Sequence, residues 1–154
     1  ADGLNNLDNE LKKLLSLRHV LTPHPGEMAR LTGKPIEDVL RDPAGFAENT
    51  AKAFGCIVLL KGAVSVAAHP DGRLRYNASG NPGLAKGGSG DVLTGIITAL
   101  LAQGLEPFDA ASAGAYILGS SAESALELLH ERALTAGDVL DAIEKTAGIT
   151  EHRN

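Results

Sequence analysis

The 154-residue chain lacks tryptophan and has only two tyrosines and three phenylalanines. Few aromatic rings are therefore present to stack against nucleic-acid bases. The formal net charge of −5 at pH 7 adds a second shortage, because binding to a polyanion depends on an excess of lysine and arginine. Together these two shortages argue against nucleic acid as a partner.

Cysteine is also scarce. Cys56 stands alone, which excludes an internal disulfide and a multi-cysteine metal site and fits a reducing, cytoplasmic location. No stretch is apolar for long enough to cross a bilayer, and the first residues do not resemble a secretory leader. We therefore expect no membrane association.

Hydrophobic residues make up 44% of the chain, enough for one globular domain with a substantial core. The apolar run 56–60 predicts a buried central strand of a parallel sheet. Segments 64–68 and 74–77 flank Pro70-Asp71-Gly72 and predict a hairpin. Strands that alternate with helices predict a three-layer αβα sandwich, in which ligands bind beyond the C-terminal ends of the strands.

Helices are predicted from apolar spacing and from the residues that start and stop them. Pro25 and Pro107 are each expected near the first helical position, and Gly33 and Gly55 are expected to end helices. Thr135 and Asp138 resemble a capping box at the start of the last helix. Two apolar faces are predicted: a first helix with Leu4, Leu7, Leu11, Leu14 and Leu15, and a long later helix with Ala111, Ala115, Leu118, Ala122, Leu126 and Leu129.

Glycine is plentiful, with eighteen residues, and several of them gather in Asn81–Leu93, NPGLAKGGSGDVL. This stretch predicts a glycine-rich loop that runs into the N-terminus of a helix, a place that suits an anion. It is neither a Walker A loop nor a dinucleotide fingerprint. Asp91 at the helix start could accept a proton from a hydroxyl that attacks a phosphate. The alternative is a simple helix cap made by Ser89 or Asp91.

Two further loops are expected at the same edge of the sheet. Lys61 follows the buried strand and could contact a phosphate or adenosine, or it could be a surface lysine. His24 could contact a substrate, or it could be a structural residue of its turn. A metal pair of His24 with Glu27 is disfavoured by Pro25 and by the absence of a third ligand, so we predict no metal site made by protein residues.

Three blocks in these loops resemble a known family. They are Thr22-Pro23-His24-Pro25-Gly26-Glu27, Leu60-Lys61-Gly62-Ala63 and the Asn81–Leu93 stretch. Their order and content resemble the ATP/ADP-dependent NAD(P)H-hydrate dehydratases, which are ribokinase-like proteins. The resemblance covers essentially the whole chain.

The resemblance implies an activity. Family members dehydrate hydrated NADH or NADPH at the expense of ATP or ADP, with Mg²⁺, and are commonly homo-oligomers such as tetramers. It also implies roles for single residues. Asp91 would be the catalytic base and a substrate contact, and His24 would be a second substrate contact. The adenine nucleotide would lie against Lys61, Gly62, Ala63, Val64, Ser65 and Gly90, and the anion hole would be formed by Gly88, Ser89 and Gly90.

The resemblance also implies that residues 1–154 are the C-terminal portion of a ribokinase-like domain. On this interpretation the remaining sheet strands and substrate contacts lie outside the sequence, and the chain alone would be inactive or unstable. Two alternatives stay open: a small-molecule kinase of the same superfamily, acting on a hydroxyethylthiazole or a sugar, and a non-catalytic nucleotide-binding module.

Overall fold

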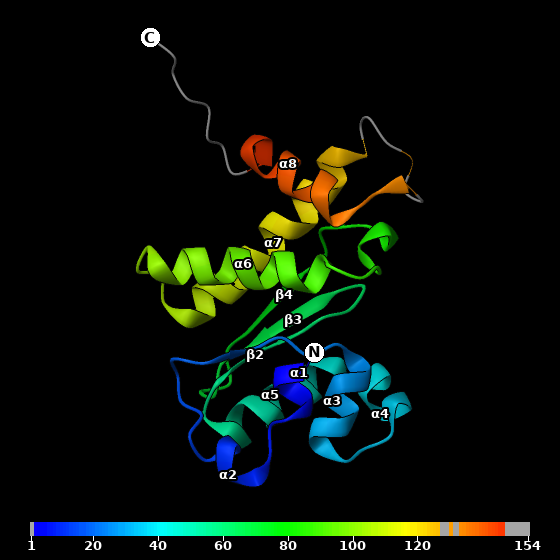
Figure 1. Ribbon diagram of the computed structural model, residues 1–154. Helices are drawn as coiled ribbons and strands as arrows, with labels where there is room; N and C mark the ends of the chain where they lie inside the picture. The colour runs from blue at the N-terminus through cyan, green and yellow to red at the C-terminus, as the bar shows by residue number, and fades with distance from the viewer. Residues whose placement is uncertain (1, 127–129, 131–132, 147–154) are drawn as a thin grey trace.

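The computed structural model describes residues 2–126, 130 and 133–146. One four-stranded sheet forms the middle layer, with the strand order β1-β2-β3-β4. Helices α1 to α5 lie on one side of the sheet, and on the other side α7 packs against the strands while α6 and α8 pack against α7 (Figure 1). The predicted three-layer arrangement is therefore confirmed. The strands are β1 (Val20–Leu21), β2 (Ile57–Leu60), β3 (Ser65–Ala68) and β4 (Leu74–Asn77).

Strand β2 is central and all four of its residues are buried, as its apolar sequence predicts. It pairs in parallel with β1, Val20 opposite Ile57, and antiparallel with β3, Val58 opposite Ala68. The prediction of a parallel sheet is thus right on one side of β2 only. A parallel neighbour needs a long crossover, which the helices between β1 and β2 supply, whereas the short connection from β2 to β3 permits only an antiparallel neighbour.

The predicted hairpin is confirmed. Strands β3 and β4 are antiparallel, and Gly72 donates its N–H to His69 O at 3.0 Å in the turn between them. Gly72 has a φ of +98°, a left-handed value that glycine adopts without a steric penalty. The hairpin brings the end of β4 to the same edge of the sheet as the end of β2.

The first helical layer follows the predicted start and stop residues. It contains α3 (Pro25–Thr32), α4 (Ile36–Arg41) and α5 (Pro43–Phe54). Gly33 and Gly55 end α3 and α5 in the left-handed conformation. Met28, Val39, Ala47 and Ala51 from these helices pack with Cys56 and Val58, and all six are fully buried.

The second helical layer contains α6 (Ser89–Ala102), α7 (Pro107–Ala125) and α8 (Ala136–Thr146). A 3₁₀ turn, η1 (Pro82–Leu84), lies in the loop before α6. The predicted apolar face of α7 is buried at Ala111, Ala115, Leu118 and Ala122, while Leu129 lies outside the described residues. The predicted capping box is present: Thr135 donates its N–H to Asp138 Oδ2 at 2.7 Å, and Asp138 donates its N–H to Thr135 Oγ1 at 3.3 Å. Among the described helices, none combines the length and the apolar character that a membrane span requires.

The N-terminal prediction is wrong. The leucine pattern does not form one helix but two single turns, α1 (Asp2–Asn5) and α2 (Asn9–Lys12). Asp8 accepts hydrogen bonds from the N–H groups of Glu10 and Leu11, and so it starts a second helix where the first was expected to continue. Two leucines of the expected inner face are exposed, Leu11 at 46% and Leu14 at 71%, whereas Leu4, Leu7 and Leu15 are partly buried.

Candidate functional site

A cavity of about 660 Å³ lies at the edge of the sheet where β1, β2 and β4 end. Loops after all three strands reach it, as do the start of α6 and one face of α7. It is lined by His24, Pro25, Lys61, Gly62, Ala63, Ser65, Asn77, Ser79, Gly80, Asn81, Pro82, Leu84, Ala85, Lys86, Ser89, Gly90, Leu93, Ala115, Leu118 and Gly119. The structure therefore brings together the three loops that the sequence singles out.

The start of α6 supplies backbone N–H groups to this cavity. Gly88 is the N-cap residue, with a φ of +92°, and no side chain from the described part of the chain caps the helix. The alternative that Ser89 or Asp91 simply caps the helix is therefore not what the structure shows. An uncapped helix start leaves N–H groups and the positive end of the helix dipole available to an anion.

Lys61 adds a positive charge at the same place. Its backbone N–H continues the pairing of β2 with the loop after β1, donating to Pro23 O at 2.8 Å. A methyl group built on Gly90 would lie 3.6 Å from Lys61 Nζ, so the ammonium group adjoins the start of α6. The ammonium group and the helix start both favour a negatively charged ligand between them.

A buried carboxylate, Glu27, fixes the opposite side of Lys61. Glu27 is 3% exposed, and its Oε2 lies 3.9 Å from Lys61 Nζ. The same oxygen accepts the backbone N–H of His24 at 2.7 Å. Burial raises the pKa of Glu27, but the hydrogen bond from His24 and the charges of His24 and Lys61 outweigh it and hold that pKa below its ordinary value. The contact of Glu27 with Lys61 is not predicted from the sequence and is visible only in the fold.

His24 has the structural role that the sequence offers as one alternative. Its Nδ1 accepts from the N–H groups of Gly26 and Glu27, at 3.1 and 3.3 Å, and so caps α3. Its Nε2 lies 3.6 Å from Glu27 Oε2. The side chain remains 52% exposed and lines the cavity.

The stability of the protein should depend on the charge of Glu27. Glu27→Gln should lower the free energy of unfolding by about 1 kcal/mol at pH 7, because a hydrogen bond to a charged group is stronger than one to a neutral group. The folded-state pKa is lowered, so this contribution is present above the ordinary value of 4.5 and is lost as the pH falls through the folded pKa. Urea unfolding at pH 7 and at successively lower pH tests this.

The control is Glu10→Gln, which removes an exposed carboxylate that pairs with Lys13 on the surface. Its effect should stay within a few tenths of a kcal/mol at any pH, roughly the value of an exposed pair. A wild-type advantage over Glu27→Gln that persists unchanged into acid would contradict the assignment.

Not every residue named in the sequence analysis lines the cavity. Gly62, Ala63, Ser65, Ser89 and Gly90 do so, together with His24 and Lys61. Val64 is 46% exposed and is not among the lining residues, and neither are Gly88 and Asp91. Asp91 lies next to Gly90 in the first turn of α6, where its side chain is exposed.

One wall of the cavity comes from α7 and was not predicted as part of a site. A side chain on Gly119 would place its Cβ 2.6 Å from the carbonyl oxygen of Ser79, so only glycine lets the segment after β4 lie against the helix. Ser79 Oγ donates to Tyr116 O at 3.3 Å, and Gly80 donates its N–H to Glu123 Oε1 at 2.7 Å. The run of small residues in α7 predicts a close backbone approach, but it does not say which segment approaches.

Comparison with known proteins identifies relatives of the chain. A family profile described as NAD(P)H-hydrate dehydratase matches residues 1–145. The chain is 47% identical to the bifunctional NAD(P)H-hydrate repair enzyme of Moorella thermoacetica, covering 92% of this chain and 27% of that protein. It is 42% identical to the ADP-dependent (S)-NAD(P)H-hydrate dehydratase of Neisseria meningitidis, covering 92% of this chain and 50% of that protein. The chain thus spans half or less of the length of these relatives.

Solved structures extend the comparison to the fold. The ADP/ATP-dependent NAD(P)H-hydrate dehydratase of Bacillus subtilis, co-crystallised with ATP and Mg²⁺, superposes with a TM-score of 0.80 at 36% identity, over 84% of this chain and 47% of that one. A ribokinase-like superfamily protein from Enterococcus faecalis superposes with a TM-score of 0.71 at 28% identity, over 86% and 45% of the two chains. The fold is therefore ribokinase-like, and the chain belongs to the NAD(P)H-hydrate dehydratase family.

Proposed function

We propose that the protein takes part in the ATP- or ADP-dependent dehydration of hydrated NADH or NADPH, which returns the intact dinucleotide. The observation that carries this proposal is the meeting of Lys61, His24 and the uncapped start of α6 in one cavity. Family membership supplies the reaction class, since the Neisseria relative is named an ADP-dependent (S)-NAD(P)H-hydrate dehydratase. The cavity supplies a place for a phosphate chain beside a proton acceptor.

The first chemical step would be transfer of a phosphoryl group. Asp91 accepts the proton of the ring hydroxyl, whose oxygen forms a bond to the terminal phosphorus of the nucleotide while the bond to the leaving diphosphate or monophosphate breaks. Negative charge on the transferred group is met by the N–H groups of Ser89 and Gly90 and by the ammonium of Lys61. This assignment uses the position of Asp91 in the first turn of α6, one residue beyond Gly90, which lines the cavity.

The second step would be elimination. The lone pair of the ring nitrogen forms a carbon–nitrogen double bond as the carbon–oxygen bond breaks and phosphate leaves, and loss of a proton then restores the reduced nicotinamide. Phosphate is a much better leaving group than hydroxide, which is the chemical reason for a kinase-like site in a dehydratase. His24, whose half-exposed ring lines the cavity, would contact the hydrated dinucleotide.

The described residues are compatible with Mg²⁺ bound chiefly through phosphate. They contain no group of three or more histidine, cysteine, aspartate or glutamate side chains that could hold a metal by themselves. Mg²⁺ commonly binds through one or two carboxylates together with phosphates and water. Mg²⁺ held by the phosphates of the nucleotide would neutralise part of their charge.

The test is an assay of the intact protein, as the cell makes it, with hydrated NADH, Mg²⁺ and either ATP or ADP. We expect NADH absorbance to return only when nucleotide is present, with release of one phosphate for each NADH formed. Absence of any nucleotide-dependent return would overturn the proposal. Accumulation of a stable phosphorylated alcohol, without NADH, would instead assign a small-molecule kinase.

A further inference from the structure

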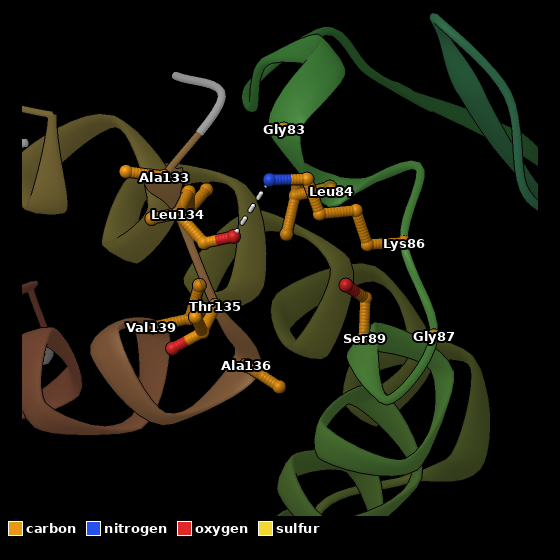
Figure 2. A pocket seen from close by; sticks show the side chains of 10 residues that line it. All are labelled: Gly83, Leu84, Lys86, Gly87, Ser89, Ala133, Leu134, Thr135, Ala136 and Val139. Carbon is orange, nitrogen blue, oxygen red and sulfur yellow. Dashed lines mark hydrogen bonds between the residues drawn. The ribbon is translucent and has the colours of Figure 1, made fainter. Parts of the chain in front are cut away.

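A second, smaller cavity lies on the other side of the glycine-rich loop. Its volume is about 250 Å³, and it separates the loop from the segment 133–139 at the start of α8 (Figure 2). Lys86 extends from the loop across this space and donates from Nζ to Leu134 O at 2.9 Å. Lys86 also lines the larger cavity, so it lies between the two.

The acceptor of this hydrogen bond belongs to a firmly held part of the fold. The side chains of Leu134 and Val139 are each 1% exposed and belong to the core under α6 and α7. The capping box of Thr135 and Asp138 fixes the first turn of α8 between them. Leu134 O is therefore presented by backbone that is held by the buried side chain of Leu134 and by the capped turn that follows it.

Lys86, the donor, by contrast belongs to a loop whose backbone can adopt many conformations. Gly87 and Gly88 follow Lys86 directly, and glycine restricts φ and ψ less than any other residue. The loop approaches α8 at a second point, because a methyl group on Gly88 would lie 3.1 Å from Ala136 Cβ. The pKa of Asp138 is held below its ordinary value, chiefly by hydrogen bonds from Thr135. The nearby charge of Lys86 lowers the same pKa to a smaller extent.

We propose that Lys86 is a positioning residue, which ties the glycine-rich loop to Leu134 and so holds the N–H groups of Ser89 and Gly90 toward the larger cavity. The inference rests on the proposed function, because those N–H groups matter when they meet a phosphoryl group. The contact acts through the backbone of the loop. Its loss should therefore affect the transition state, where the position of each donor is critical, more than the binding of nucleotide.

Lys86→Met tests the proposal, since it keeps an unbranched apolar side chain but removes the ammonium. In the intact protein, kcat for nucleotide-dependent return of NADH should fall about tenfold, with little change in KM for nucleotide. Hydrogen exchange of the amides 87–90 should become faster in the same variant. Lys86→Arg, which can still donate to Leu134 O, should recover most of both losses.

The matched control is Lys34→Met, which removes a charge from the end of α3 in the opposite helical layer and should leave both readouts at their wild-type values (Figure 1). Unchanged kcat and unchanged exchange in Lys86→Met would overturn the proposal. So would a raised KM for nucleotide with normal kcat, which would make Lys86 a direct ligand contact. If the wild-type protein shows no dehydration, the proposed function fails, and the exchange measurement still decides whether Lys86 holds the loop.

Discussion

Asp91→Asn should reduce turnover of hydrated NADH by about 10²–10⁴-fold, the range expected when a general base is removed. The amide cannot accept the proton of the ring hydroxyl, yet it has almost the same size and shape. Asp91 is exposed in the first turn of α6 and is not a core residue, so the variant should fold normally. Nucleotide affinity should persist, since Lys61 and the helix start remain in place.

The measurement pairs steady-state kinetics with nucleotide binding by calorimetry. Asp141→Asn is the matched control, because it removes an exposed aspartate on α8, away from the cavity, and should leave both quantities unchanged. A non-catalytic nucleotide-binding module would respond differently: Asp91→Asn would change neither activity, which would be absent, nor binding. Retention of near-normal turnover in Asp91→Asn would remove Asp91 from the mechanism.

Gly119→Ala should produce the largest loss of stability among single-methyl changes in this part of the fold. The added Cβ would lie 2.2 Å from Ser79 Oγ and 2.6 Å from the Ser79 carbonyl carbon and oxygen. A serine side chain can rotate, but a backbone carbonyl can move only with its segment. We expect a cost of about 1–3 kcal/mol, the usual cost of overpacking, and a melting temperature lower by about 2–4 °C for each kcal/mol.

The same change should weaken nucleotide binding, because Ser79 and Gly80 line the cavity and would be pushed away from α7. Gly95→Ala is the control, and its expected effect on stability is opposite in sign. Gly95 lies inside α6, and a methyl group there would meet no atom within 4 Å. Replacing a helical glycine with alanine should therefore stabilise the protein by about 0.5–1 kcal/mol. Equal effects at positions 95 and 119 would show that helix propensity, rather than the contact with Ser79, decides the outcome.

The sequence predicts most of the helices and strands because the residues that begin and end them act through local backbone preferences. Pro25, Gly33 and Gly55 act through their own backbone preferences, and the structure places them at the helix boundaries that these preferences imply. The prediction of one N-terminal helix is wrong because the spacing of the leucines alone does not reveal a helix cap within the segment. Asp8 interrupts that spacing with hydrogen bonds that stabilise a separate turn.

Only part of the site can be predicted from short stretches of sequence. The glycine-rich stretch, Lys61 and His24 could be chosen from residue type and from their places after predicted strands. Three contacts in the site each join residues more than 30 positions apart. They are the contacts of Glu27 with Lys61, of Ser79 with Gly119 and of Lys86 with Leu134. Such pairs depend on how layers pack, and no pattern within a short window determines that.

The missing cap at Gly88 also has a consequence for the energy balance of the protein. A serine, threonine, aspartate or asparagine at a helix N-cap adds about 1 kcal/mol of stability relative to alanine, and roughly a few tenths of a kcal/mol relative to glycine. The left-handed φ of +92° at Gly88 disfavours such a side chain, so the ligand-free protein does without that contribution. An anion that binds at the start of α6 would supply the missing acceptors. Anion binding there would therefore stabilise the folded protein, and binding of nucleotide as proposed would make the free energy of unfolding rise with nucleotide concentration.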